Sequence, residues 1–461
     1  GLGDVYKRQL IILCCLKSFP LWSYNVNMIV EHYSVDQGLP NNTVNCTLKD
    51  RDGFIWFGTW YGLCCFDGVK FKTFNKQEHD SDVPPRKIQR IVEDKNGYIW
   101  VKTIDRKLYV FNKVTECFHA VYDDMKNYSE NIQVIKLQNT AEGDVLLLTK
   151  DKNLLLAGVD EKGQVTIKIL FDSRNEINKH DYTLKHHVLC ETEEYISWIG
   201  TDYKVAAVHK GSELASRPAD FITSKINSGD KDSFTSFFED GRKVWVGDRA
   251  GIFYSIDVRT GLVNRYVLSE IKGAISNLLV TPAGYVYLSV AGQGTYEYDL
   301  AERRLQKINT EMNDAMVTHA FIDQYDKIWF HENEKALIYY DPLNHTAKRF
   351  PFTMFGKITT LYSEDAGERG LFFLSPAGEA WLFDREHAEM VYINKLKQLS
   401  NDRANQQFYH LMLDNDGVLW LSSADEGVYC MNFPKKQFNL LSLSPQSVGQ
   451  ENYATGVRAL F

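Results

Sequence analysis

The sequence lacks an excess of positive charge, with 52 Lys and Arg against 60 Asp and Glu and a net charge of −8. Nucleic-acid binding depends on neutralising backbone phosphates, so a nucleic-acid partner is not expected. Cysteine is also scarce: the eight present show no CxxC or Cys/His ligand spacing. We therefore predict neither a disulfide framework nor a metal site. Cys64 and Cys65 are adjacent in a strand-like run, so their side chains are expected on opposite faces, one of them in the core.

Long hydrophobic runs are missing as well. The most apolar stretch, in "LIILCCLKSFPLWSYN", is too short to cross a bilayer. We interpret residues 1–24 as adapter-like residues, "GLGDVYKRQ", followed by the remnant of a secretory signal. A stray first strand is the alternative. Export combined with few cysteines favours a bacterial periplasm as the location.

Catalytic signatures are absent too. The sequence contains no GxSxG, HExxH or P-loop motif. The adjacent His186 and His187 have no carboxylate at a ligand spacing. "DRDG" and "DNDG" resemble the start of a calcium loop but lack its later ligands, so we interpret them as turns. No catalytic residue, metal or cofactor is predicted.

A ten-residue phrase is present repeatedly. "DRDGFIWFGT" near the start returns as "DNDGVLWLSS" from Asp414 to Ser423. Aligning on its central large side chain gives nine units, spaced by 44, 46, 52, 47, 42, 42, 43 and 48 residues. The central residues are Trp56, Trp100, Leu146, Trp198, Trp245, Tyr287, Trp329, Phe372 and Trp420.

Each unit is typical of four short antiparallel strands. An apolar run is followed by an Asp/Gly turn, an aromatic strand, a second turn and two further strands. Repeated at about 45 residues, this pattern predicts an all-β fold, a β-propeller of four-stranded antiparallel blades. One such sheet cannot cover both of its faces, so blades must stack, and the repeated aromatic is predicted to pack between them.

The nine units do not fit one common ring size. We expect a seven-bladed propeller over residues 25–352 and the first blades of a second, incomplete propeller over 353–461. The segment "IVEHYSV" resembles an outermost strand without a blade, and it is expected to close a ring by pairing with a distant strand. Units one and nine match each other best, so a nested ring made of units two to eight is the alternative.

The stretch "GLPNNTVNCTLKDRDGFIWFGTWYGLCCFDGVKFKTF" resembles the two-component-regulator propeller repeat. The resemblance covers about residues 28–461 and is most specific at 38–74 and 409–440. It implies the periplasmic sensor of a hybrid two-component histidine kinase. In that family, propellers bind oligosaccharides released from a glycan and switch polysaccharide-utilisation genes. The resemblance also implies a homodimer in the full-length protein, and membrane attachment and kinase domains beyond this segment.

Candidate ligand-binding residues lie in the predicted turns between second and third strands, which should share one ring face with the links between blades. Flat aromatic rings suit the C–H faces of sugars, and planar polar groups suit paired hydroxyls. The candidates are Trp60, Tyr61, Asp105, Arg106, Asp202, Tyr203, Arg249 and Gln293, with Asn333, Glu334, Asp425 and Glu426 in the equivalent turns. The long links 75–87 and 172–187 are expected to contribute specificity.

The leading hypothesis is a non-enzymatic sensor segment that binds an oligosaccharide. The alternatives are a secreted propeller glycosidase or polysaccharide lyase, which would need opposed carboxylates or a Tyr/His/Arg group, and a cytosolic protein-interaction propeller.

Overall fold

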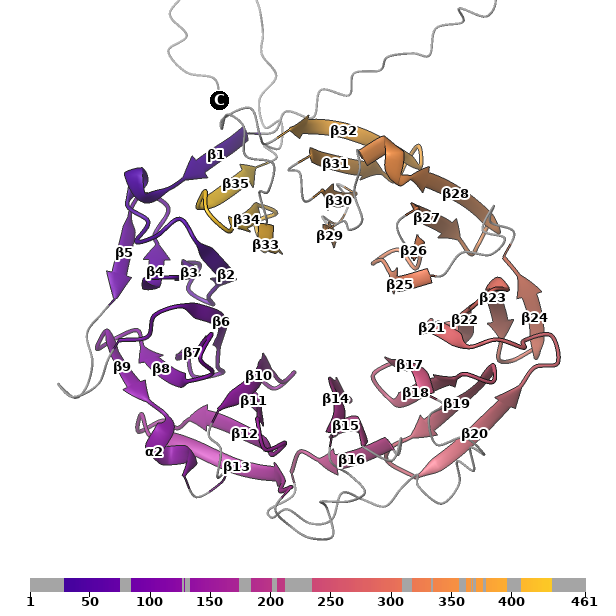
Figure 1. The fold of residues 1–461 in the computed structure, drawn as a ribbon, viewed down its shortest axis with the longest axis horizontal. Helices are drawn as coiled ribbons and strands as arrows, with labels where there is room; N and C mark the ends of the chain where they lie inside the picture. Colours follow the sequence, from indigo (N-terminus) through magenta and orange to yellow (C-terminus); the bar gives the residue numbers. More distant parts are fainter. Residues whose placement is uncertain are drawn as a thin grey trace, which may run out of the picture. The chain divides into compact units, whose positions relative to one another are not determined.

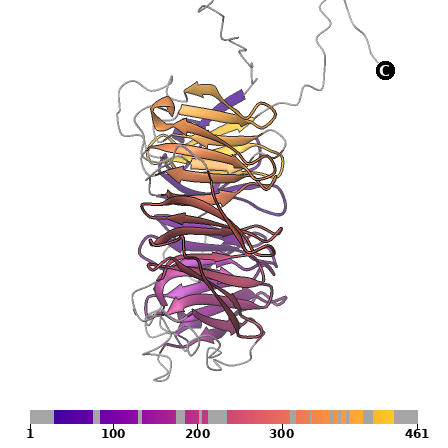
Figure 2. The ribbon, with the colours of Figure 1, turned by 90° about the vertical axis from the view of Figure 1, so that its right-hand side faces the viewer.

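The computed structural model describes residues 29–74, 84–126, 128, 133–173, 184–200, 205–211, 234–308, 317–332, 335–355, 362–365, 367, 370–375, 379–395 and 408–432. Within these ranges the strands form nine sheets, eight four-stranded and one three-stranded, arranged about a common centre (Figure 1). Viewed from the side, the sheets lie one above another (Figure 2). Val30–Met431 form one compact unit. The predicted all-β propeller of antiparallel blades is confirmed.

The blades are numbered along the chain, with the innermost strand of each given first. Blades 1 to 3 are β2 (Val44–Lys49), β3 (Ile55–Thr59), β4 (Gly62–Phe66) and β5 (Phe71–Phe74); β6 (Ile88–Glu93), β7 (Ile99–Thr103), β8 (Leu108–Asn112) and β9 (Cys117–Ala120); and β10 (Val134–Asn139), β11 (Val145–Thr149), β12 (Leu154–Val159) and β13 (Val165–Phe171). Blades 4 to 6 are β14 (Leu184–Glu191), β15 (Tyr195–Gly200) and β16 (Val205–His209); β17 (Phe234–Glu239), β18 (Lys243–Asp248), β19 (Ile252–Asp257) and β20 (Leu262–Val267); and β21 (Ile275–Val280), β22 (Tyr285–Val290), β23 (Gly294–Asp299) and β24 (Arg304–Lys307).

Blades 7 and 8 are β25 (Val317–Ile322), β26 (Ile328–Glu332), β27 (Ala336–Asp341) and β28 (Thr346–Pro351); and β29 (Tyr362–Asp365), β30 (Leu371–Leu374), β31 (Glu379–Asp384) and β32 (Glu389–Lys395). Blade 9 is β33 (Phe408–Leu413), β34 (Leu419–Ser423), β35 (Val428–Asn432) and β1 (Ile29–Tyr33). The helical elements in the described residues are short: η1 (Val35–Gln37), α2 (Tyr122–Met125) and η2 (Phe352–Phe355). None of these has the length and apolarity of a bilayer-spanning helix.

Blade 9 closes the ring because its outermost strand, β1, comes from the beginning of the chain (Figure 1). His32 Nε2 donates to the Glu426 carbonyl oxygen at 2.6 Å. The aromatic ring of Tyr33 packs between blades 9 and 1. Its centroid lies 5.0 Å from that of Phe66 in blade 1 and 6.5 Å from that of Trp420 in blade 9. The prediction that the first strand pairs with a distant one is therefore confirmed.

The division into a seven-bladed ring over 25–352 and a second propeller over 353–461 is wrong for the described residues. Blades 8 and 9 belong to the same compact unit as the first seven, and β1 pairs with β35 rather than with blade 7. Units one and nine resemble each other because they are neighbours: Phe57 of blade 1 and Trp420 of blade 9 share one buried cluster. The nested alternative, in which units two to eight form their own ring, is contradicted by other contacts: Trp56 of blade 1 packs with Phe111 of blade 2, and β29 of blade 8 contacts β33 of blade 9.

In several blades, an Asp carboxylate of that blade stabilises the turn between the first and second strands. Asp50 Oδ1 accepts hydrogen bonds from the backbone N–H of Asp52 (3.0 Å) and Phe54 (2.9 Å). Its Oδ2 accepts the indole N–H of Trp56 at 2.7 Å. Gly53 completes the turn at φ +92°, a conformation that favours glycine. The same Asp-to-indole bond recurs in other blades, at Asp94–Trp100, Asp240–Trp245, Asp323–Trp329 and Asp414–Trp420. The interpretation of "DRDG" and "DNDG" as turns is confirmed.

The central residues of all nine units are buried, at 0–5% exposure. They pack between blades as predicted: Trp56 lies in one cluster with Phe111 of the next blade, and Trp329 with Phe373. Cys64 and Cys65 face opposite sides of blade 1, in different clusters. Both are buried, so each side of the blade uses one of them as core.

Blades 1 and 5 each approach the following blade closely beside a glycine of their second strand. A Cβ on Gly58 would lie 2.4 Å from Cys46 Sγ and 2.6 Å from Ile88 Cγ2 of the next blade. Gly247 is equally confined, by Ser236 and Ile275. Glycine at this position lets neighbouring blades approach closely.

Asp50 also pairs with the ammonium of Lys113, at 3.0 Å. We expect Asp50→Asn to lower the free energy of unfolding by about 3 kcal/mol, because an amide cannot accept from both the turn and the buried indole while pairing with Lys113. Asp52→Asn is the matched control, since Asp52 is exposed and contacts the same lysine; it should cost clearly less than Asp50→Asn. Urea denaturation measures both, and equal costs would contradict this role for Asp50.

Gly58→Ala is expected to destabilise the fold by about 1–3 kcal/mol through overpacking between blades 1 and 2. The control is Gly158→Ala in β12, where a Cβ would meet only ordinary contacts, the nearest at 3.5 Å. That change should leave stability unchanged or raise it by up to about 1 kcal/mol. Thermal unfolding of the two variants gives the comparison.

Candidate ligand-binding site

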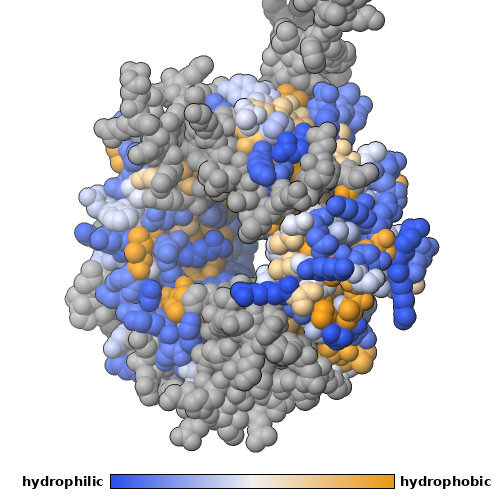
Figure 3. All heavy atoms as spheres, turned by 45° about the vertical axis from the view of Figure 1, so that its right-hand side comes forward, coloured by the Kyte–Doolittle hydropathy of each residue, from blue (hydrophilic) through white to orange (hydrophobic). Residues whose placement is uncertain are grey.

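The two faces of the ring carry different loops. Turns between first and second strands and between third and fourth strands lie on one face, which we call the Asp-turn face. Turns between second and third strands share the other, the link face, with the connections between blades. In a space-filling view the surface is hollowed at the centre of the ring, with hydrophilic and smaller hydrophobic groups interspersed around it (Figure 3).

Trp60 and Tyr61 form the β3–β4 turn on the link face. They are 38% and 60% exposed. Lys87, just before β6, donates its backbone N–H to the Trp60 carbonyl oxygen at 2.9 Å, and its Nζ lies 5.1 Å from the indole centroid. Ile104 N–H in turn donates to the Lys87 carbonyl oxygen at 2.9 Å. Lys87 therefore joins the β3–β4 turn of blade 1 to the β7–β8 turn of blade 2.

Asp105 and Arg106 occupy that β7–β8 turn, and both are exposed. Partial burial acts to raise the pKa of Asp105, but hydrogen bonding by Thr103 and Lys107 outweighs it and lowers the pKa. Arg106 has φ +68°, an uncommon conformation for a non-glycine residue. Four of the predicted residues, Trp60, Tyr61, Asp105 and Arg106, thus lie in adjoining turns.

The other predicted residues that the structure describes lie in other blades. Arg249 is exposed in the β18–β19 turn of blade 5. Gln293 of blade 6 braces a blade link: its Oε1 accepts from Lys272 N–H at 2.7 Å and its Nε2 donates to the Glu270 carbonyl oxygen at 3.1 Å. The Glu426 carboxylate of blade 9 accepts from Tyr429 Oη at 2.5 Å, while Asp425 is exposed beside it. Outside the described residues lie Asp202, Tyr203, Asn333 and Glu334, and the side chains of His186 and His187.

A β-bulge recurs at the link-face end of the innermost strands, between the first and third residues, as at Val44/Cys46 and Ile88/Arg90. Bulges bend a strand and often occur next to binding sites. The third residue then pairs with the residue two positions after the central aromatic. We call these the post-bulge pairs: Cys46–Gly58, Arg90–Lys102, Lys136–Leu148, Ser236–Gly247, Asn277–Ser289, His319–His331 and His410–Ser422.

None of these paired residues is acidic, and blade 2 places two cations directly opposite each other. Lys102 is 5% exposed, and its Nζ donates to Gln89 Oε1, a neutral acceptor at the bulge. Burial, and then the charge of Arg106, lower the pKa of Lys102. Like charges directly opposite on neighbouring strands are destabilising, so this pair is a cost to the fold.

Arg90 also influences two other innermost strands. It opposes protonation of His410, whose pKa is lowered to about 4, mainly by burial and secondarily by Arg90. His410 Nδ1 is buried and has no hydrogen-bond partner in the described part of the chain. Burial raises the pKa of Cys46 to about 12, and Arg90 acts to lower it. The post-bulge pairs of blades 9, 1 and 2 therefore carry the two cations Arg90 and Lys102 and no carboxylate.

Several cations on the Asp-turn face are paired with carboxylates. Lys113 Nζ lies 3.0 Å from Asp50, 2.6 Å from Asp52 and 2.8 Å from Glu93. Similar pairs join other blades, at Arg385–Asp323, Lys210–Glu142 and Arg259–Glu194. Asp50, Asp52 and Glu93 are close enough together to hold a metal ion, but the Lys113 ammonium bridges them. This face stabilises the junctions between blades.

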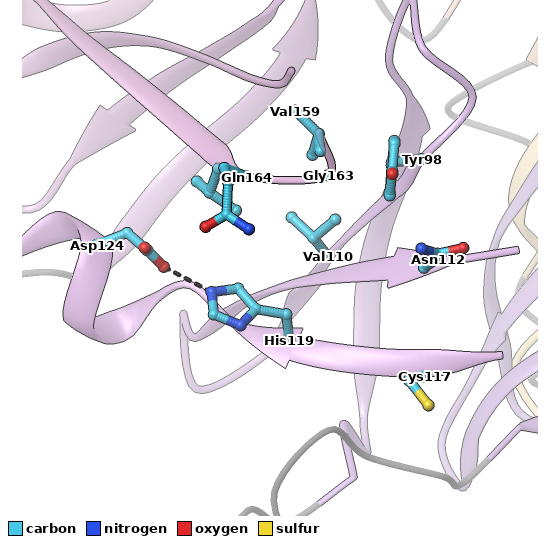
Figure 4. A pocket seen from close by; sticks show the side chains of 10 residues that line it. Tyr98, Val110, Asn112, Cys117, His119, Asp124, Val159, Gly163 and Gln164 are labelled. Atoms are coloured by element: carbon cyan, nitrogen blue, oxygen red, sulfur yellow. Dashed lines mark hydrogen bonds and ion pairs between the residues drawn. The ribbon is translucent and has the colours of Figure 1, made fainter. Parts of the chain in front are cut away.

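A small cavity of about 110 Å³ lies between the outer parts of blades 2 and 3. His119 Nε2 donates to Asp124 Oδ2 at 2.7 Å on its wall (Figure 4). Cys117 also lines it, and its thiol donates to the Thr115 carbonyl oxygen at 3.3 Å. The sequence reasoning did not single out this site.

Sequence reasoning also missed Arg90, Lys102 and His410. A usable signal was present for Lys102, because the repeat alignment places it where blades 1 and 5 have Gly58 and Gly247. Blades 1 and 5 admit no side chain at this position, and blades 3, 6, 7 and 9 have Leu148, Ser289, His331 and Ser422 there, so a lysine marks blade 2 as different. Nothing in the sequence showed that Arg90 pairs with Lys102, since the bulge shifts the register.

Comparison with known proteins gives one family match. Residues 38–61 match the two component regulator propeller model, so the chain contains that repeat at blade 1. No curated protein matches the chain in sequence.

Solved structures with similar folds include the extracellular domains of two hybrid two component systems from B. thetaiotaomicron. One is 14% identical with a TM-score of 0.34, covering 86% of this chain and 58% of that one. The other is 14% identical with a TM-score of 0.27, covering 87% and 66%. The chain thus spans less than two thirds of either. A virginiamycin B lyase from Staphylococcus aureus is 8% identical with a TM-score of 0.34, covering 88% and 99%.

The pKa of His410 predicts a loss of stability in mild acid. The folded state holds His410 neutral down to about pH 4, whereas the unfolded chain takes up the proton near its ordinary pKa of 6.5. Stability is therefore fully present above pH 6.5 and falls as the pH drops toward 4. Between pH 7 and pH 5 this group should account for about 2 kcal/mol. Urea denaturation at both pH values should show a correspondingly smaller decrease for His410→Gln; an unchanged decrease would rule out a buried neutral His410.

Proposed function

We propose that this chain is the extracytoplasmic sensor portion of a hybrid two-component histidine kinase, located in the periplasm. In this role it binds an oligosaccharide released from a target glycan. Binding then signals to control polysaccharide-utilisation genes. The observation that carries the proposal is the match of residues 38–61 to the two component regulator propeller model.

The matched segment contains both architectural and exposed elements. It runs from Gly38 through β2 and β3 to Tyr61. Asp50 and Trp56 in it build the blade, whereas Trp60 and Tyr61 at its end are exposed on the link face. An exposed aromatic pair on a rigid sheet suits stacking against a sugar ring, because little conformational entropy is lost on binding.

The asymmetry of the two faces supports the same role. Charges on the Asp-turn face pair with one another across blade junctions. The link face presents turns whose side chains are exposed, at Trp60, Tyr61 and Arg106. Binding residues commonly lie on loops positioned by a rigid framework. We assign ligand binding to the link face and signal transmission to a homodimer of the full-length protein.

Calorimetry of the whole chain against a panel of neutral and acidic oligosaccharides tests the proposal. At least one oligosaccharide should bind at micromolar to millimolar concentration. Trp60→Ala should weaken that binding about tenfold or more, because stacking of a nucleic-acid base on an aromatic side chain contributes on the order of 1–3 kcal/mol and a similar loss is expected for a sugar ring. Tyr325→Ala, an exposed aromatic on the Asp-turn face, is the control. Binding that is unaffected by Trp60→Ala would remove the link face from the proposal, and release of cleaved product would indicate an enzyme instead.

A further inference from the structure

We propose that blade 2 provides a site on the link face for the anionic group of an acidic saccharide, formed by Lys87, Arg90, Lys102 and Arg106. The carboxylate of a uronic acid and a sulfate ester share the required chemistry. This inference deepens the proposed sensing function and rests on it, since it names the class of oligosaccharide.

The four cations differ from Lys113, Lys210 and Arg385 in how their positive charge is compensated. Lys113, Lys210 and Arg385 each contact two or more carboxylates on the Asp-turn face. For the blade 2 group, no carboxylate lies within ion-pairing distance among the residues that the structure describes. Asp105 is in the same turn, but it is held by Thr103 and lies 3.4 Å from Lys107. A chain with net charge −8 thus leaves four neighbouring cations around blade 2 without a paired carboxylate.

Lys102 is the strongest sign of a ligand. Its side chain is buried, its acceptor is the neutral Gln89, and its cross-strand partner is the cation Arg90. A buried charge without a counter-charge is costly, and most folds avoid it. In blade 1 the equivalent position is Gly58, so packing between blades does not require a lysine there. A charge kept at a cost, with a pKa lowered by burial and by Arg106, is typical of a binding site.

The neighbouring groups favour a saccharide over a simple inorganic anion. Lys87 links the blade 2 cations to the exposed aromatic turn, because its Nζ lies over the Trp60 ring at 5.1 Å while its carbonyl oxygen accepts from Ile104. Arg106 can form two parallel hydrogen bonds to a carboxylate or sulfate. The apolar face of a sugar ring could then contact Trp60 or Tyr61 while its acidic group contacts the cations.

The test uses calorimetry on the whole chain at low ionic strength, with tetragalacturonate, a sulfated chondroitin tetrasaccharide, neutral maltotetraose and inorganic sulfate as probes. We expect one acidic tetrasaccharide to bind at least about tenfold more tightly than the neutral one, as expected for charge-assisted hydrogen bonds. The galacturonate and chondroitin arms distinguish carboxylate from sulfate recognition.

Lys102→Met removes the buried charge and keeps the side-chain length. It should weaken binding of the acidic tetrasaccharide about tenfold or more and leave the melting temperature unchanged or higher, because an uncompensated charge is lost. Arg106→Gln, on an exposed turn, should weaken binding similarly without affecting folding. Arg304→Gln is the control: it also removes one positive charge, on the outer strand β24 next to Glu302, and should leave binding unchanged.

The outcomes separate this inference from the proposed function. Equal binding of neutral and acidic probes, or full binding by both blade 2 variants, overturns the anionic site while oligosaccharide sensing stands. Binding of inorganic sulfate alone overturns saccharide recognition at this site. If no probe binds and no other oligosaccharide of the larger panel binds either, the sensing function fails together with the inference. A marked loss of stability in Lys102→Met would show that Lys102 is structural.

Discussion

The ring depends on a carboxylate that holds a turn and an indole at once. In blade 1 one oxygen of Asp50 accepts two backbone N–H groups of the turn, and the other accepts the N–H of Trp56. The bond fixes the register between first and second strands and aims the largest side chain at the adjoining blade. Without it, a buried indole would leave its only donor unsatisfied. Repetition of this bond in blades 2, 5, 7 and 9 gives separate sheets the same geometry, so that they can stack.

Because Asp carboxylates hold these turns, the two faces of the ring carry different arrangements of charge. Asp50 and Glu93 attract Lys113, and Asp323 attracts Arg385, so cations on the Asp-turn face are drawn into blade junctions. The bulges at the opposite end of the innermost strands bring other residues together, among them Arg90 and Lys102. Structural electrostatics and the candidate site therefore occupy opposite ends of the same strands, and changes at one need not disturb the other.

Much of the fold could be predicted from the sequence, because the Asp–Gly turn and the central aromatic recur at a period that only stacked four-stranded sheets explain. The number of blades in the ring could not. Pairing of β1 with β35 depends on which edge remains open after all blades have stacked, and the repeat spacing does not encode this. For the site, exposure of Trp60 and Tyr61 followed from their place in a turn. The bracing role of Gln293 and the pairing of Arg90 with Lys102 depend on contacts and on a register shift that residue type does not show.

The contribution of β1 to blade 9 makes that blade unlike the others. The polypeptide itself runs from each described blade toward the next, including from β1 through residues 34–43 into blade 1, whereas inside blade 9 the circle is closed only by the pairing of β1 with β35. The pairing of β1 with β35 is the one place in the described ring where the circle can open without a peptide bond being broken. Any strain on the ring, from a bound ligand or an attached segment, would concentrate at the β1–β35 pairing.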